Sequence, residues 1–417
     1  MNTRMDRSRL NIGAYILQPY ARTEEHIRGI KEAGLDFIVS MEPVPETLDL
    51  FSKYGIGLAS AFGVIPGWWG GNGDKAGQMA ESLPLEKYVE AAKKFEDHPA
   101  VWGIDMGDEP SALDFDHFGK VTNCVQTIFP RQFGYLNLYP NYASVAQNTA
   151  QQTVNQLGTA TYAEHIEEYC KKVPLDYISF DFYPYALRDT VRGISGCLEN
   201  FRVVADAARR YGKSLWYVPQ VNSSKPEEWI SENRLRFQAF TAMAFGAESI
   251  IWACYTAGWW HNQVLDANGE KTEQYEKLKT VNKEIATLGV PYMKYRNTYT
   301  HFVGMSADSE IVSMVNQAPV EQLDNGYFRG LKSDAGQALV VGDMTSRISN
   351  DKKAVFVVAV DDYRDLDAKS SNIVFKCDCR AVVAYGKDGK VPVNYDAETG
   401  VYSIAIRSNE GILIEAI

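Results

Sequence analysis

The chain has 417 residues, of which 45% are hydrophobic and 23% are charged, and its formal net charge is −11. This composition is that of an ordinary globular protein with a large core, and it excludes an intrinsically disordered chain. The negative charge, without any basic run, argues against nucleic acid and against an anionic membrane surface as partners.

Targeting signals and cofactor motifs are missing from the sequence. There is no 18-residue apolar run, and the first ten residues carry charges but no apolar segment, so we expect neither membrane insertion nor an uncleaved signal peptide. A signal removed earlier would leave the same sequence, so the compartment stays open. The six cysteines form no Cys-x-x-Cys motif and the histidines form no His-x-x-x-His motif. We therefore expect no catalytic metal and no cofactor.

Short apolar runs alternate with amphipathic segments from residue 11 onward, as in successive strand and helix units of a parallel sheet. The predicted strands span residues 11–18, 36–42, 57–64, 101–107, 132–138, 177–183, 214–220 and 249–255. Predicted helices include residues 23–33, with Thr23 as the N-cap, and residues 85–95, 162–172, 197–211, 232–246 and 273–288. Eight such units close a (β/α)8 barrel, whereas an open doubly wound sheet lacks its Gly-x-Gly-x-x-Gly signature here.

The pattern changes after residue 290 to strands separated by turns, which is typical of an antiparallel β-sandwich. These strands are predicted at residues 299–303, 310–316, 326–332, 339–342, 354–360, 373–377, 381–385, 401–406 and 412–415. The predicted fold is therefore an α/β TIM barrel over residues 1–290, followed by a C-terminal β-sandwich domain over residues 291–417. We interpret the sandwich as a structural cap on the barrel, with a sugar-binding module as the alternative.

The most informative segment, Val-Trp-Gly-Ile-Asp-Met-Gly-Asp-Glu-Pro, spans residues 101–110. It runs from an apolar strand into Asp108 and Glu109 and then into Pro110. Catalytic groups of (β/α)8 barrels lie at the carboxyl ends of the strands, so both acids should face the pocket. The alternative is that they only cap a helix that Pro110 begins. Asp181, at the end of the sixth strand, is a third acidic candidate, or else a structural partner of Arg131.

Aromatic, amide and carboxylate side chains follow the other strand ends. Such a lining suits a sugar ring, whose C–H faces stack on aromatic rings while its hydroxyl groups need polar partners. The candidates for substrate binding are Tyr15, Glu42, Trp68, Trp69, Asn137, Tyr139, Tyr183, Trp216, Gln220, Trp252, Tyr255, Trp259 and Trp260. Trp252, inside a strand, also suits a core position. The expected partner is a carbohydrate, and the oligomeric state stays open.

The barrel resembles the retaining glycoside hydrolases of clan A, whose fourth strand ends in Asn-Glu-Pro with the Glu as general acid/base. The matching residues are Asp108, Glu109 and Pro110. With Ser-Phe-Asp-Phe-Tyr-Pro at residues 179–184 and Ala-Phe-Gly-Ala-Glu-Ser-Ile at residues 244–250, the chain is similar to bacterial glycosidase-like barrels over nearly its full length. The resemblance implies that Glu109 is the proton donor.

The chain departs from the clan at the seventh strand, where Gln220 stands in place of the nucleophilic Glu. Glu227 and Glu228 could replace it only if their loop folded back. One route is substrate-assisted: Asp108 orients a 2-acetamido group, as the similar Asp-Glu pair does in hexosaminidases of families 20 and 123, with Tyr139 or Tyr183 holding its oxygen.

A second route is that of a β-galactosidase-like glycosidase, in which Asp181 or Glu42 supplies the second carboxylate. A third interpretation is a non-catalytic glycan-binding protein on a degenerate glycosidase barrel. A β-linked glycan is the favoured ligand. The sequence leaves open the sugar, the linkage, the anomer and the stereochemical outcome.

Overall fold

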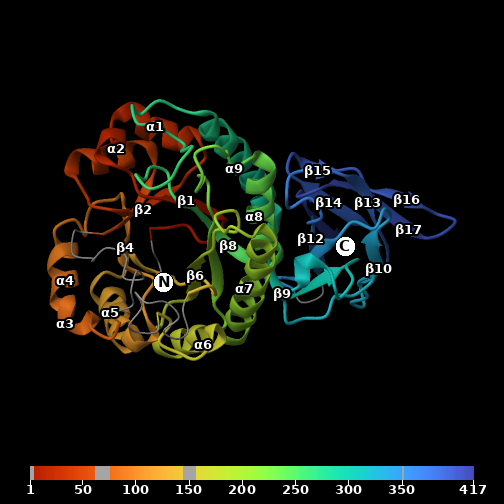
Figure 1. The fold of residues 1–417 in the computed structure, drawn as a ribbon, viewed down its shortest axis with the longest axis horizontal. Helices are drawn as coiled ribbons and strands as arrows, with labels where there is room; N and C mark the ends of the chain where they lie inside the picture. Colours follow the sequence, from red (N-terminus) through yellow and green to blue (C-terminus); the bar gives the residue numbers. More distant parts are fainter. Residues whose placement is uncertain (1–3, 62–75, 144–155, 350–351) are drawn as a thin grey trace.

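The structure is a computed structural model that describes residues 4–61, 76–143, 156–349 and 352–417. Eight parallel strands form a closed barrel in chain order, and β8 pairs back with β1 (Figure 1). They are β1 (Asn11–Tyr15), β2 (Phe37–Met41), β3 (Gly57–Ser60), β4 (Val101–Asp108), β5 (Phe133–Leu138), β6 (Tyr177–Asp181), β7 (Ser214–Val218) and β8 (Ala247–Trp252). The predicted (β/α)8 barrel is confirmed.

Helices surround the barrel, and their ends follow from local sequence. They are α1 (Glu24–Glu32), α2 (Pro45–Tyr54), α3 (Met79–Ser82), α4 (Leu85–Lys93), α5 (Phe115–Ile128), α6 (Tyr162–Lys172), α7 (Thr190–Tyr211), α8 (Glu232–Ala244) and α9 (Glu273–Tyr292). Thr23 caps α1 as predicted, because its hydroxyl accepts a hydrogen bond from the His26 backbone. The prediction for Pro110 is wrong: Ser111 caps a short 3-10 helix, Ala112–Asp114, that precedes α5.

Aromatic rings fill the amino-terminal half of the barrel interior. The ring of Trp216 stacks on that of Tyr177 with centroids 3.9 Å apart. Gly103 leaves room for the ring of Phe133, since a Cβ at Gly103 would lie 2.8 Å from it. A solid interior of this kind is usual in such barrels and leaves the carboxyl ends of the strands as the accessible end.

The C-terminal region forms two antiparallel sheets, as predicted. One has the order β10-β13-β17-β16 and the other β15-β14-β18-β12-β11-β9. The strands are β9 (Tyr295–Val303), β10 (Phe328–Ser333), β11 (Leu339–Ser346), β12 (Lys353–Ala359), β13 (Ser370–Cys377), β14 (Val382–Gly386), β15 (Gly389–Val391), β16 (Asn394–Asp396), β17 (Val401–Arg407) and β18 (Gly411–Ala416). Buried apolar side chains from both sheets form one shared core.

One predicted C-terminal strand is wrong. Residues 310–316 contain a 3-10 helix, Glu310–Val312, whose Ile311 and Val312 are buried. The segment packs on α7, where the Ser195 hydroxyl accepts a hydrogen bond from the Met314 backbone at 2.7 Å. The strand prediction failed because two adjacent apolar residues that pack on a helix give the same short apolar run in the sequence as a buried strand does.

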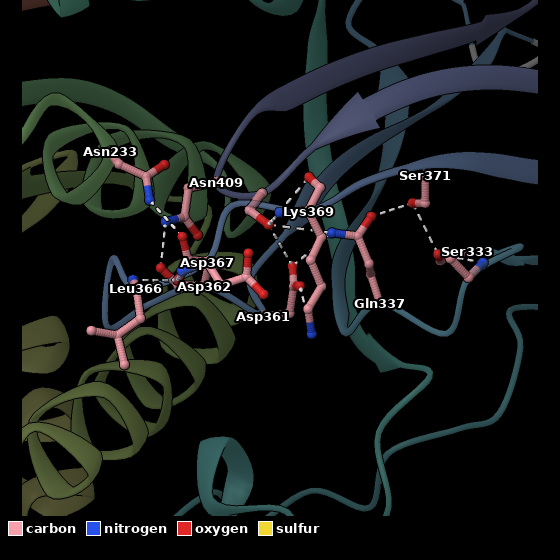
Figure 2. Close-up of polar contacts among 12 residues, drawn as sticks. Asn233, Ser333, Gln337, Asp361, Asp362, Leu366, Asp367, Lys369, Ser371 and Asn409 are labelled. Atoms are coloured by element: carbon pink, nitrogen blue, oxygen red, sulfur yellow. Dashed lines mark hydrogen bonds and ion pairs between the residues drawn. The ribbon is translucent and has the colours of Figure 1, made fainter.

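The six-stranded sheet lies against α8 and α9 (Figure 1), and a buried carboxylate secures this junction. Figure 2 shows Asp362, whose carboxylate accepts hydrogen bonds from the backbones of Leu366 at 2.8 Å and Asp367 at 3.1 Å. It also accepts the Asn233 amide of α8 at 3.3 Å, and the Asn409 amide donates to the Asp362 carbonyl at 3.0 Å. The loop between β12 and β13 is thereby fixed to the barrel.

Candidate functional site

The end of β4 departs from regular strand geometry at the two predicted acids. The pairing of β4 with β5 shifts register between Asp105 and Gly107. Glu109 then adopts a left-handed backbone conformation with φ of 48°, while its backbone N–H donates to the Asn137 carbonyl at 2.9 Å. Such a conformation costs a non-glycine residue about 1 kcal/mol or more and is concentrated at functional sites.

Three of the sequence-predicted residues meet here as a carboxyl cluster, Asp108, Glu109 and Asp181. The amide of Asn137 donates to Asp181 at 2.8 Å and to Asp108 at 3.2 Å. The carboxyl groups of Glu109 and Asp181 are hydrogen-bonded to each other. Glu109 and Asp181 are buried, whereas Asp108 is half-buried. The structure therefore brings β4, β5 and β6 together at one polar centre.

A chain of hydroxyl groups fixes the orientation of the Asn137 amide. Its oxygen accepts the Ser179 hydroxyl at 3.0 Å, and Ser179 lies 3.2 Å from the hydroxyl of Tyr135. Tyr15 donates in turn to Tyr135 at 2.8 Å. Because the amide oxygen is engaged by Ser179, the amide nitrogen faces the two carboxyl groups.

Asp105 is a fourth carboxyl group in this region; it is buried, and the sequence pattern did not identify it as a site residue. One of its oxygens accepts the Gly107 backbone N–H at 3.2 Å, and the other accepts the Ser40 hydroxyl. Ser40 itself has a left-handed φ of 59°. Asp105 therefore holds the irregular end of β4 and links it to β2, so it is a positioning residue for Asp108 and Glu109. The one sequence feature that could have drawn attention to Asp105 is its position three residues before the Asp108-Glu109 pair.

Burial raises the pKa values of all four acids, and the charges of neighbouring acids add to this rise for Asp105, Glu109 and Asp181. For Glu109, burial comes first, then the charges of Asp181 and Asp108, and its pKa lies well above its usual range. Burial raises the pKa of Asp181 to about 8, that of Asp105 to about 7 and that of Asp108 to about 6. The Asn137 hydrogen bond lowers the pKa of Asp108 and thereby limits its rise. Glu109 thus holds its proton to higher pH than an exposed glutamate, and Asp108, with a pKa of about 6, ionises at lower pH than Asp105 and Asp181.

Aromatic side chains surround this centre. Tyr139 is buried, and the negative charges of Glu109, Asp108 and Asp181 add to the burial that raises its pKa. The ring of Tyr183 meets that of Trp260 edge to face at a centroid distance of 5.4 Å. Trp259, the neighbouring residue, is 65% exposed.

Two predicted tryptophan contacts are wrong. Trp216 is 1% exposed and lies in the middle of β7, stacked on Tyr177 with Arg7 over its ring. Trp252 is fully buried, and its indole N–H donates to the Asn282 side chain of α9 at 2.8 Å. Both rings therefore belong to the core, since that of Trp216 packs among Phe133, Tyr135 and Tyr177 and that of Trp252 lies against α9.

Gln220 and Tyr255 are also structural. The Gln220 oxygen accepts the Tyr185 backbone N–H at 2.9 Å, and its nitrogen donates to the Asn222 carbonyl at 3.2 Å. This amide is fully buried, so it is not presented to a ligand hydroxyl group. Tyr255 is buried beside Tyr275, and the charges near its hydroxyl group are those of Tyr275, Glu32 and Tyr20 rather than those of the carboxyl cluster.

The remaining candidates lie apart from the cluster or cannot be placed. Glu42 follows β2, is exposed, and has the charge of Arg22 near it. Glu228 is bound by Arg234 and Lys225, so its loop does not bring it to the carboxyl cluster. Arg131 pairs with Asp97 instead of Asp181. Trp68 and Trp69, like the end of the predicted third strand, lie outside the described residues.

Within the described ranges, no group of three or more His, Cys, Asp or Glu side chains has a geometry suited to a metal ion. The polar groups at the centre are carboxyl, amide and hydroxyl groups. They can transfer protons and bind hydroxyl or amide groups of a ligand. In the same part of the chain, none of the helices has the length and apolar character needed to cross a membrane.

The structure is thus a (β/α)8 barrel with an added β-domain, and its acidic cluster lies at the carboxyl ends of the strands. A protein from Bacteroides fragilis proposed to be an alpha-galactosidase aligns with 98% of this chain and 79% of its own, with a TM-score of 0.50 and 10% identity. The endo-beta-1,4-mannanase of Thermotoga petrophila aligns over 100% and 96%, with a TM-score of 0.48 and 10% identity.

A third structure is the catalytic module of a family 98 glycoside hydrolase from Streptococcus pneumoniae, in complex with the H-disaccharide blood group antigen. It aligns over 100% of both chains, with a TM-score of 0.42 and 9% identity. No family model and no curated protein matches the chain. At these identities the likeness concerns the fold alone.

The raised pKa of Asp105 predicts how stability depends on pH. An unfolded Asp loses its proton near pH 4, whereas Asp105 in the folded protein keeps it to about pH 7. Between these values the native state binds more protons, so the free energy of unfolding falls as pH rises. Between pH 5 and pH 8, the free energy of unfolding should fall by about 2 kcal/mol less in Asp105→Asn than in wild type, as measured by denaturant unfolding at each pH.

The matched control for this measurement is Asp388→Asn, at an exposed turn between β14 and β15. It should leave the pH dependence as in wild type. If Asp105→Asn and wild type lose the same stability over this interval, Asp105 is not a buried group with a raised pKa.

Proposed function

We propose that this protein hydrolyses glycosidic bonds, with Glu109 as the general acid/base. The observation that carries the proposal is the contact of the buried Glu109 carboxyl group with Asp181, beside Asp108. A general acid must hold its proton at the working pH, and enzymes achieve this by burying a carboxyl group near other carboxylates. The raised pKa of Glu109 fulfils this condition.

Asp181 acts in this proposal by retaining the Glu109 proton. The carboxyl groups of a retaining glycosidase are about 5 to 5.5 Å apart, and those of an inverting enzyme are further apart, so that sugar or water fits between them. A direct hydrogen bond between Glu109 and Asp181 is shorter than either separation. This geometry favours proton control by Asp181 over nucleophilic attack or activation of water by it.

Asp108 then supplies the second catalytic role through the substrate. It precedes Glu109, is half-buried, and is largely ionised at neutral pH because its pKa is about 6. In a 2-acetamido sugar, its carboxylate can accept the acetamido N–H and direct the acetamido oxygen to the anomeric carbon. That carbon–oxygen bond forms as the glycosidic bond breaks, and Glu109 protonates the departing oxygen. Water then attacks the anomeric carbon and opens the five-membered ring that the acetamido group has formed with it. One proton of this water passes to Glu109, which restores the acid.

The fixed side chain of Gln220 supports this route over one that needs a seventh-strand carboxylate. Both ends of its amide are bound to backbone groups of Tyr185 and Asn222. Tyr139 and Tyr183 remain as donors for the acetamido oxygen, and Trp260 can form one wall of the sugar site beside Tyr183. Trp259 offers an exposed ring for a further sugar unit.

The first prediction of this proposal concerns substrate choice. Wild-type protein should hydrolyse aryl β-glycosides of N-acetylglucosamine or N-acetylgalactosamine at least 100-fold faster than those of glucose or galactose, because only the former contain the internal nucleophile. Glu109→Gln should lower kcat/KM by about 100-fold or more on a substrate with a poor leaving group. The measurement is steady-state hydrolysis across the four sugars.

The control variant is Glu164→Gln, on the exposed amino-terminal turn of α6. It should retain wild-type rates. Equal rates on plain and acetamido sugars would contradict substrate assistance, and full activity of Glu109→Gln would contradict the assigned acid. Binding of these sugars without hydrolysis would identify a glycan-binding protein instead.

The second prediction concerns pH. The kcat/KM profile should rise as Asp108 loses its proton near pH 6 and fall at higher pH as the Glu109–Asp181 pair loses its proton. Asn137→Ala removes the hydrogen bond that stabilises the Asp108 carboxylate. The pKa of Asp108 should therefore rise in this variant, and the acidic limb of its kcat/KM profile should move to higher pH by about 1 unit.

Asn123→Ala, an exposed position of α5, is the matched control and should leave both limbs in place. An acidic limb that does not move in Asn137→Ala would show that Asp108 does not set it.

A further inference from the structure

Two neighbouring cavities lie at the end of the barrel opposite the carboxyl cluster. The first, of about 570 Å³, is lined by Ser214 and Leu215 at the start of β7, by the ends of α7 and α8, and by β9. The second, of about 370 Å³, lies between β9, the segment after β11 and the end of β18. Both include Arg7 and Arg347. We refer to the two cavities together as the basic groove.

The basic groove has a charge opposite to that of the chain. Seven Lys or Arg residues and three Asp or Glu residues line it, whereas the whole chain has a net charge of −11. Concentration of one sign of charge in a concave surface raises the local concentration of ligands of the other sign. This arrangement favours an anionic ligand.

Part of the positive charge is held in place by the protein. Arg7 pairs with Asp176 and donates to the Ser214 hydroxyl at 2.9 Å. Arg347 pairs with Glu248 and donates to the Tyr295 carbonyl at 3.0 Å. These contacts preorganise the shared centre of the groove.

The remaining positive charge is available to a ligand. Lys294, Arg296 and Lys352 are exposed, and within the described parts of the chain their side chains have neither a hydrogen bond nor an ion pair to an acidic group. Lys294 and Lys352 line the smaller cavity, and Arg296 lines the larger one. Free cations are therefore present on both sides of the shared arginines.

We infer that the basic groove binds an acidic oligosaccharide, whose carboxylate or sulfate groups pair with Lys294, Arg296 and Lys352. Guanidinium and ammonium groups bind both kinds of anion, and the volumes match those of small-ligand sites. The choice of a glycan rests on the proposed function. Strands β7 and β8 begin at the groove and end at the face that carries the carboxyl cluster, so the groove and the cluster lie at opposite ends of the barrel. An acidic glycan bound in the groove would therefore anchor the protein without occupying the carboxyl cluster.

The test is isothermal titration calorimetry of the full chain with short dextran sulfate, oligogalacturonate and neutral dextran. The triple variant Lys294→Gln, Arg296→Gln, Lys352→Gln should bind the acidic probe about tenfold more weakly than wild type. The matched control Lys279→Gln, Lys283→Gln, Lys390→Gln removes three exposed charges elsewhere and should bind as wild type does. Dextran should not bind, and 0.5 M salt should weaken binding of the acidic probes.

Binding of only one acidic probe supports the inference and names the anionic group. Equal weakening by the control variant, binding of neither acidic probe, or tighter binding of a DNA duplex would overturn it. So would salt-sensitive self-association through the same three residues. Hydrolysis of a small aryl glycoside should be the same in wild type and both triple variants. Hydrolysis by wild type without binding of either acidic probe therefore refutes only this inference, and groove binding without hydrolysis refutes only the proposed function.

Discussion

Three carboxyl groups, those of Asp105, Glu109 and Asp181, are buried at one end of the barrel beside the half-buried Asp108, and among the described residues none of the four pairs with a Lys or Arg side chain. A buried charge without a counter-charge is costly, so such groups bind protons more tightly than they do in water. The amide of Asn137 and the hydroxyl of Ser40 stabilise part of the remaining negative charge. The repulsion among the carboxylates and the few hydrogen bonds that they accept together determine which of the four carboxyl groups keep a proton.

The barrel supplies the geometry for that balance. Parallel strands end at the same rim, so β4, β5 and β6 bring an Asp-Glu pair, an Asn and an Asp within contact of one another. The register shift after Asp105 and the left-handed conformation of Glu109 then adjust a regular strand end to this purpose. The hydrogen bond from Gly107 to Asp105 makes the adjustment part of the fold.

The sequence was sufficient to predict the barrel and the β-rich C-terminal region, and its strand pattern identified Asp108, Glu109 and Asp181 as candidates at strand ends; that the three meet in one cluster is seen only in the structure. It was not sufficient for Trp216 and Trp252. Both lie in predicted strands, but one residue of register decides whether a side chain faces the interior, a helix or the open end. The apolar pair Ile311 and Val312 led to the wrong strand prediction for residues 310–316 for a similar reason. Burial against α7 and burial in a sheet produce the same apolar pattern in the sequence.

The role of Asp105 depends on an irregularity that no periodic pattern encodes, namely the bulge that turns its carboxylate toward Gly107 and Ser40. Gln220 could be excluded as a nucleophile by its chemistry, but its binding to the backbone could be seen only in the folded chain. Sequence therefore identifies the acids, and tertiary contacts determine which of them retains a proton.

The most direct measurement is a pH titration of the protein by NMR with ¹³C-labelled glutamate carboxyl groups, in which Glu109→Gln identifies the Glu109 resonance. If burial and the neighbouring acids keep Glu109 protonated, one resonance should titrate at a clearly higher pH than those of exposed glutamates and should be missing from the variant. If the Glu109 resonance titrates between about pH 4 and pH 5, like an exposed glutamate, Glu109 is not the proton donor proposed here.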